Sequence, residues 1–235
     1  MLLMKNWYET RLRFLFLLAI STAMAVWVAM GPLSKLKTPY ISGSVRPDVS
    51  VVFNLSLLGA IMLAGAGIKT QPGFQNAKGM HGSMHYTLSM PVTRTRLLAI
   101  RVAVGLAETA GLHLLMCIIF WLTIPVIRLH ANPSDICKYG FATLFVVATL
   151  HLMSVLYATF LDDQYQWLAS IFTMVALMIT MHSVPLPPAF DSLMVLTSGS
   201  PLVTHSMPWL GIGLLLIISL FLWAASAKIV ESREY

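Results

Sequence analysis

Charged side chains are scarce in this sequence. Asp, Glu, Lys and Arg make up 10% of the 235 residues, whereas 57% are hydrophobic. Because soluble globular domains carry about 25% charged residues, this composition is typical of an integral membrane protein. At about 20 residues per spanning helix, the length allows roughly five to seven spans and leaves too little chain for a separate soluble domain.

Motifs that carry chemistry are also missing. The sequence holds no G-x-x-x-x-G-K-[ST] phosphate loop, no H-E-x-x-H zinc motif and no G-x-S-x-G nucleophile turn. Its two cysteines, Cys117 and Cys137, form neither a disulfide framework nor a zinc site. His81 and His85 have the i, i+4 spacing of two metal ligands, but no third ligand stands near them. We therefore expect a non-enzyme that binds no metal, no cofactor and, by itself, no ATP.

Long apolar runs are what the sequence does contain. They predict an all-α membrane protein that forms a single transmembrane domain over residues 1–235. Six spans are expected, at about 12–30, 49–68, 97–124, 139–160, 165–183 and 209–227. Pro125 is expected to end the third span, and Asp162-Asp163 to form a tight turn between the fourth and the fifth.

Two further segments are expected at the membrane surface. Residues 1–11 carry Trp7 and Tyr8 ahead of the first span and predict a retained interfacial helix. The proline-rich stretch 184–208 contains an apolar fragment, 190–196, that is too short to span and too apolar to float free. It predicts a re-entrant or interfacial segment between the fifth and sixth spans.

The basic residues set the predicted orientation. The net charge of +6 would suggest nucleic acid in a soluble protein, but here the Lys and Arg residues lie at the ends of apolar runs, where they contact lipid headgroups. Ten of the fifteen lie on the side of the two termini and five on the other. The positive-inside rule then places both termini in the cytoplasm of a multi-pass protein of the inner or plasma membrane.

Glu108 is the only acidic residue deep inside a predicted span, and His113 and His151 lie in the third and fourth spans. Burying Glu108 as an anion costs about 2.5 to 3.5 kcal/mol, so it needs a partner or a proton. Two roles are open for Glu108: a site that binds substrate or a proton, and a structural contact between helices. The two histidines are either proton relays or hydrogen-bonded to neighbouring helices.

A polar, basic connector joins the second and third spans, over residues 69–96. It runs directly into the apolar helix that begins near Leu97, which is typical of a contact surface on one side of the bilayer. The residues that carry this interpretation are Lys78, His81, Gly82, Ser83, His85, Tyr86, Thr87, Pro91 and Arg94.

The run HYTLSMPVTRTRLL at 85–98, continued by Arg101 and by GLAE at 105–108, resembles the segment between the second and third helices of type-2 ABC exporter permeases. Gly82-Ser83 stands where that family usually has Gly-Thr. The order of elements is also similar over essentially the whole chain. One departure is that the family usually has acidic residues ahead of this pair, whereas no carboxylate lies between Asp48 and Glu108.

The resemblance implies a half-transporter that pairs with a second permease, identical or related, and with ABC ATPase subunits that hold ATP and Mg. The connector would be a cytoplasmic coupling helix resting on the ATPase. Two other functions are compatible with the residues: a proton-linked secondary carrier using Glu108, His113 and His151, and a non-transporting membrane assembly subunit. The transported substrate does not follow from the sequence.

Overall fold

The computed structural model describes residues 2–30, 40–41, 44–45, 51–64, 93–161, 163–183 and 200–232. Within these ranges the chain is all-helical apart from one very small hairpin. The elements in order are α1 (Leu2–Met30), β1 (Tyr40–Ile41), β2 (Ser44–Val45), α2 (Val51–Ala64), α4 (Arg94–Thr123), α5 (Pro125–His130), α6 (Pro133–Phe160), α7 (Asp163–Ser183), α8 (Pro201–Thr204) and α9 (Trp209–Ser232). The strands pair antiparallel, Tyr40 with Val45 and Ile41 with Ser44.

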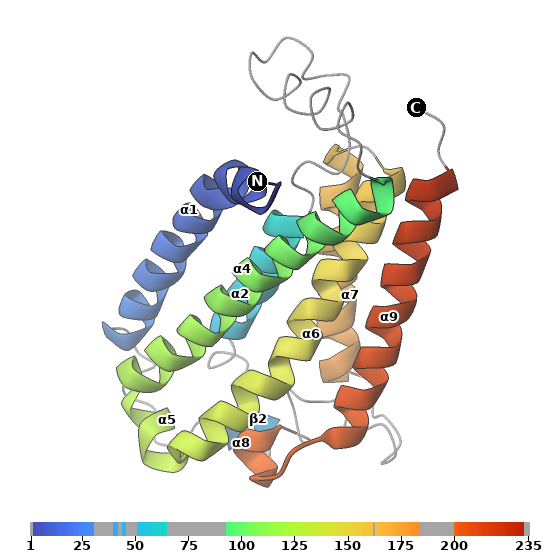
Figure 1. Cartoon of the computed structure of the whole chain (residues 1–235). Coiled ribbons are helices and arrows are strands. Elements are labelled where there is room, and N and C mark those ends of the chain that lie inside the picture. The colour runs from blue at the N-terminus through green and yellow to red at the C-terminus, as the bar shows by residue number, and fades with distance from the viewer. Residues whose placement is uncertain are drawn as a thin grey trace.

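Helix α6 is the centre of the bundle, and α2, α4, α7 and α9 pack around it (Figure 1). Helix α4 runs obliquely across the bundle, and α1 packs on α4 and α2 at one edge. The start of α1, the start of α4 and the end of α9 lie at one end of the bundle, while α5, β2 and α8 lie at the opposite end. The core between the helices is apolar and includes the fully buried side chains of Leu57, Ile61, Leu112, Met116 and Val147.

Three helices are long and apolar enough to cross a membrane: Thr95–Thr123, Pro133–Phe160 and Trp209–Ser232. Shorter apolar helical stretches cover Leu55–Ala64 and Tyr165–Leu177. Large apolar side chains such as Phe16, Phe172 and Phe221 are exposed on the outside of the bundle, at 57%, 75% and 73%. Apolar surface of this extent fits a lipid environment, so the chain is a multi-pass membrane protein.

Pro125 separates α4 from α5, as expected for a residue that lacks an N–H and cannot continue a helix. The sequence also predicts a short loop between the third and fourth spans, at residues 125–138, and this prediction is wrong. Residues 125–130 and 133–138 are helical, because Pro125 and Pro133 each occupy the first turn of a new helix, where the missing N–H costs nothing. Helix α6 therefore begins six residues before the predicted span at 139.

The predicted separate interfacial helix is likewise part of a longer element. Helix α1 runs from Leu2 to Met30 without a break, since no Gly or Pro interrupts this stretch. Helix α7 begins at Asp163, three residues after α6 ends, so the two helices form the expected hairpin. Most of the predicted re-entrant stretch, residues 184–199, lies outside the described residues.

Gly105 allows α4 and α6 to approach closely. A Cβ at this position would lie 2.8 Å from Cε1 and 2.9 Å from Nε2 of His151. The His151 ring is not free to move away, since its Nδ1 is 3.1 Å from the carbonyl oxygen of Ala60 on α2. The junction of α2, α4 and α6 is therefore built around one glycine and one imidazole.

Replacing Gly105 with Ala should destabilise the bundle by about 1 to 3 kcal/mol, the usual cost of overpacking a tight core. Gly111 on the same helix is the matched control, because nothing lies within 4 Å of its would-be Cβ. Gly111→Ala should be neutral or stabilising by up to about 1 kcal/mol. Unfolding of the two variants in mixed micelles with increasing denaturing detergent measures the difference, and equal stabilities would contradict the close approach.

Candidate functional site

Most of the predicted contact residues of the connector lie outside the described residues: Lys78, His81, Gly82, Ser83, His85, Tyr86, Thr87 and Pro91. The backbone of Arg94 is described, but its side chain is not. What is described is the point where the connector enters the bundle. Thr93 is the N-cap of α4, with φ −62° and ψ 145°, and its hydroxyl accepts from the N–H of Arg96 at 3.4 Å. The connector thus passes into a 30-residue helix through a capped start.

The start of α4 is also held by the end of α9. The hydroxyl of Thr95 donates to Oε1 of Glu231 at 2.5 Å. A carboxylate beside the first turn of a helix also interacts favourably with the positive end of the helix dipole. Two elements that lie 136 residues apart in the chain are therefore joined at the end of the bundle where the connector enters (Figure 1).

Glu108 lies in the middle of α4 and is 6% exposed. Its Oε1 forms a hydrogen bond with the hydroxyl of Thr10 on α1. Its Oε2 is buried and has no hydrogen-bond partner among the described residues. The carboxyl group therefore joins α1 to α4 through only one of its two oxygens.

His151 on α6 is fully buried and contacts two other helices. A carbonyl oxygen can only accept, so Nδ1–H of His151 donates to Ala60 on α2. The hydroxyl of Thr109 on α4 lies 3.4 Å from the same nitrogen. His151 thus occupies an interhelical hydrogen bond, which is one of the two roles that the sequence allows.

His113 on α4 is also fully buried and faces α6. Its Nε2 is 2.9 Å from Oγ1 of Thr143 and 3.2 Å from the carbonyl oxygen of Gly140. Because the Thr143 hydroxyl donates to the Tyr139 carbonyl at 2.6 Å, it accepts from His113, whose proton therefore sits on Nε2. Three polar side chains of α4 thus reach two neighbouring helices: Glu108 reaches α1, whereas Thr109 and His113 reach His151 and Thr143 of α6.

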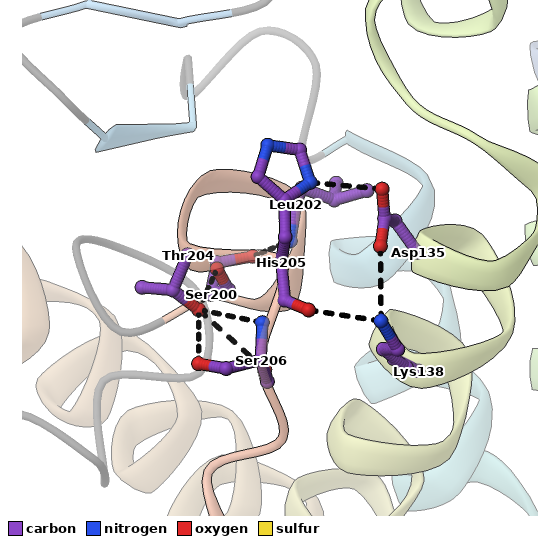
Figure 2. Close-up of polar contacts among 7 residues, drawn as sticks. All are labelled: Asp135, Lys138, Ser200, Leu202, Thr204, His205 and Ser206. Carbon is purple, nitrogen blue, oxygen red and sulfur yellow. Dashed lines mark hydrogen bonds and ion pairs between the residues drawn. The ribbon is translucent and has the colours of Figure 1, made fainter.

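The opposite end of the bundle carries an ionic cluster that the sequence did not reveal (Figure 2). Asp135, in the first turn of α6, is 3% exposed. Its Oδ2 lies 2.8 Å from Nδ1 of His205, and its Oδ1 lies 3.2 Å from Nζ of Lys138. Lys138 also donates to the carbonyl oxygen of His205 at 2.8 Å. The cluster fastens the end of α8 to the start of α6.

The backbone of the α8 segment is shaped for this contact. Ser200 caps α8 by accepting from the N–H of Leu202 at 3.3 Å, and the buried Leu202 anchors the turn in the core. His205 follows with φ 56°, a left-handed conformation that favours glycine. A histidine in this position turns its imidazole toward Asp135 (Figure 2).

Sequence reasoning had only a weak signal for this cluster. Asp135 and Lys138 are i, i+3 neighbours, which places them on one helix face only if the segment is helical. His205 is 70 residues from Asp135 and lies within residues 192–227, which contain no Asp, Glu, Lys or Arg. Among the described residues no group of three His, Cys, Asp or Glu side chains is placed to hold a metal ion.

Comparison with protein-family models, with curated proteins and with solved structures gives no match for this chain.

Removing Asp135 should loosen α8 without unfolding the bundle. We expect Asp135→Ala to cost about 1 to 2 kcal/mol, less than the roughly 3 to 5 kcal/mol of a fully buried pair, because its cationic partners can return to water. The side chains of Lys138 and His205 are 33% and 60% exposed. Asp135→Asn should cost less, since the amide oxygen still accepts a hydrogen bond.

Arg128→Ala serves as the control for this prediction, because Arg128 is exposed on α5 at the same end of the bundle. Its effect on the unfolding free energy should stay within about 0.5 kcal/mol. A loss for Asp135→Ala no larger than that of the control, in detergent unfolding of the two variants, would argue against a stabilising cluster.

Proposed function

We propose that this chain is the membrane-spanning permease subunit of an ATP-driven exporter of the type-2 ABC class, working in the inner or plasma membrane with both termini in the cytoplasm. The observation that carries the proposal is the way α4 begins. The polar, basic connector passes through the Thr93 cap into a helix that crosses the bundle from one end to the other (Figure 1). Such a helix can transmit a push on the connector to the transmembrane core.

The contacts of α4 support this role. It packs against α1, α2, α6 and α9, so a displacement of its start would reach most of the bundle. Packed cores rearrange between discrete states rather than deforming gradually, which suits a rocking motion driven by a partner. The Thr95 to Glu231 hydrogen bond would carry the same displacement into α9.

The helix order fits the six-span arrangement that the resemblance implies. Each of the six expected spans overlaps one helix, α1, α2, α4, α6, α7 or α9, and three of these, α4, α6 and α9, are long and apolar enough to cross a membrane. The starts of α1 and α4 and the end of α9 share one end of the bundle, as a cytoplasmic connector and cytoplasmic termini require (Figure 1). The capped α8 segment at the other end is compatible with the last part of a re-entrant region.

The sequence has no phosphate loop, so in this proposal a partner subunit supplies the ATPase. In this proposal the connector residues Lys78, His81, Gly82, Ser83, His85, Tyr86, Thr87, Pro91 and Arg94 form the ATPase contact. ATP and Mg belong to the partner, a second permease copy or a related permease completes the transporter, and lipid surrounds it. The connector's lack of acidic residues implies that its surface complements an acidic rather than a basic groove.

A proton-linked secondary carrier is the second candidate, and one observation favours it. Glu108 places a buried carboxyl oxygen without a described hydrogen-bond partner in the middle of a long span. In that case transport would follow a pH gradient without ATP and would collapse in Glu108→Gln. In the ABC proposal, transport requires ATP whether or not a pH gradient is present.

Gentle purification of the tagged chain from its own membranes tests the first proposal. The intact complex should have the mass of two permeases with two ATPase subunits, and it should hydrolyse ATP in a vanadate-sensitive way. A stable, transport-competent protein that never associates with an ATPase, and whose transport ignores vanadate, would exclude the proposal. If the complex forms but no continuous polar pathway opens in it, the assembly-subunit function is favoured instead.

Replacing His81, Tyr86 or Arg94 with Ala should uncouple hydrolysis from motion while leaving the fold intact. Losing a contact worth about 1.4 kcal/mol weakens the interaction roughly tenfold. Spin labels at the exposed positions 8 and 228 measure how the distance across the bundle changes with ATP. In the three variants this change should be smaller than in the wild type, while ATP hydrolysis continues. Arg128→Ala, at the opposite end, is the control, and normal coupling in all three variants would refute the contact assignment.

A further inference from the structure

The chain buries two carboxyl groups in very different surroundings. Asp135 is 3% exposed, and both of its oxygens meet nitrogen donors, from Lys138 and His205. Glu108 is 6% exposed; its Oε1 meets only a hydroxyl, that of Thr10, and its Oε2 has no hydrogen-bond partner within the described part of the chain. Opposite surroundings of this kind indicate opposite charge states for two buried acids.

An ionised carboxylate is an acceptor only, with about four lone-pair sites to satisfy. For Asp135 the charge is matched by Lys138 and by His205 when its ring is protonated. For Glu108 a single hydroxyl would have to stabilise the whole charge inside a membrane span, which is among the most costly placements of an acidic side chain. A neutral acid avoids this cost, since an unpartnered carbonyl oxygen is far less expensive than an unpartnered anion.

The hydrogen bonds of Thr10 fit a neutral acid. Its hydroxyl carries one hydrogen, and the described oxygens within its reach include Oε1 of Glu108 and the carbonyl oxygen of Trp7, the latter at 3.4 Å. If Glu108 carries a proton, its O–H donates to Thr10, and the Thr10 hydroxyl is released to donate to Trp7. If Glu108 is ionised, Thr10 must give its only hydrogen to the carboxylate.

Three ionisable groups on the surrounding helices have described partners other than Glu108. On α1, Arg11 stacks over the Tyr8 ring at 4.6 Å and faces outward. On α6, His151 is bonded to Ala60, and on α9, Glu231 is bonded to Thr95. Helix α2 contains no ionisable residue. Arg101 is seven residues before Glu108 on α4 itself, a rise of about 10.5 Å.

We propose that Glu108 is a proton-binding site, held as a neutral carboxylic acid that donates its O–H to Thr10 and thereby fastens α1 to α4. Loss of this proton would place a negative charge between the two helices. Among the described elements, α1 packs mainly on α4 and α2. A charge between α1 and α4 would therefore weaken the packing of α1 on the bundle. The proposal does not depend on an ATPase partner.

Infrared spectroscopy of the purified full chain in lipid vesicles at neutral pH tests the proposal directly. A protonated carboxyl group absorbs at a higher frequency than the amide bands. Labelling glutamate with 13C at the side-chain carboxyl lowers the frequency of a glutamic acid band but not that of an aspartic acid band, so the two are distinguished. We expect one isotope-sensitive acid band in the wild-type chain and its loss in Glu108→Gln. Absence of this band from the wild type, or its persistence in the variant, would overturn the proposal.

Three further variants keep the test decisive. If Glu108→Gln does not fold, the combined Glu9→Gln, Glu231→Gln and Glu234→Gln variant leaves Glu108 as the sole glutamate. The isotope-sensitive band must then remain. Thr10→Val removes the hydroxyl at nearly constant volume and should shift the band, whereas Thr10→Ser should leave it in place. An unshifted band in Thr10→Val would exclude Thr10 as the acceptor of a hydrogen bond from the Glu108 O–H.

Discussion

The arrangement of the bundle depends on polar side chains of one helix meeting backbone or side-chain partners on another. Within a membrane, association of helices gains little from burying apolar surface, because lipid is as apolar as the core. The His151 contact with Ala60 and the His113 contact with Thr143 therefore do more than fill space. They fix the rotation of α6 relative to α2 and α4, and Gly105 allows the close approach that the His151 contact requires.

Similar contacts continue on the other faces of α6. Ser154 meets Ser170 of α7 at 2.8 Å and also accepts from Gln166 at 3.2 Å. Thr149 meets Ser219 of α9 at 2.9 Å. Each contact is modest, at about 0.6 kcal/mol in membrane proteins, but together they hold the central helix from several sides. In the described part of the chain, the peripheral α1 is joined to the bundle by the hydrogen bond between Thr10 and Glu108.

The two ends of the bundle differ in kind. At the end opposite the termini, Asp135, Lys138 and His205 form an ionic fastening that joins α8 to α6. At the end of the termini, the contacts described for the start of α4 are its Thr93 cap and the bond from the Thr95 hydroxyl to the Glu231 carboxylate.

Much of the fold follows from local sequence. Runs of about 20 apolar residues have few alternatives to spanning helices, since backbone groups in lipid must be satisfied internally. Pro125 ends α4 because a proline cannot continue a helix, and the two residues between α6 and α7 force a hairpin. The start of α6 was misplaced because a Pro-containing polar stretch reads as a loop, although Pro133 in fact opens the helix.

The sequence by itself determined the helical membrane class, the approximate positions of the long helices and the presence of ionisable groups at 108, 113 and 151 within them. Only the tertiary structure decided their partners: Thr10 for Glu108, Thr143 for His113 and Ala60 for His151. It also joined Asp135 to His205 across 70 residues. The reason is physical, because spans are set by local hydrophobicity, whereas the pairing of polar groups depends on the rotation and register of helices that are distant in the chain.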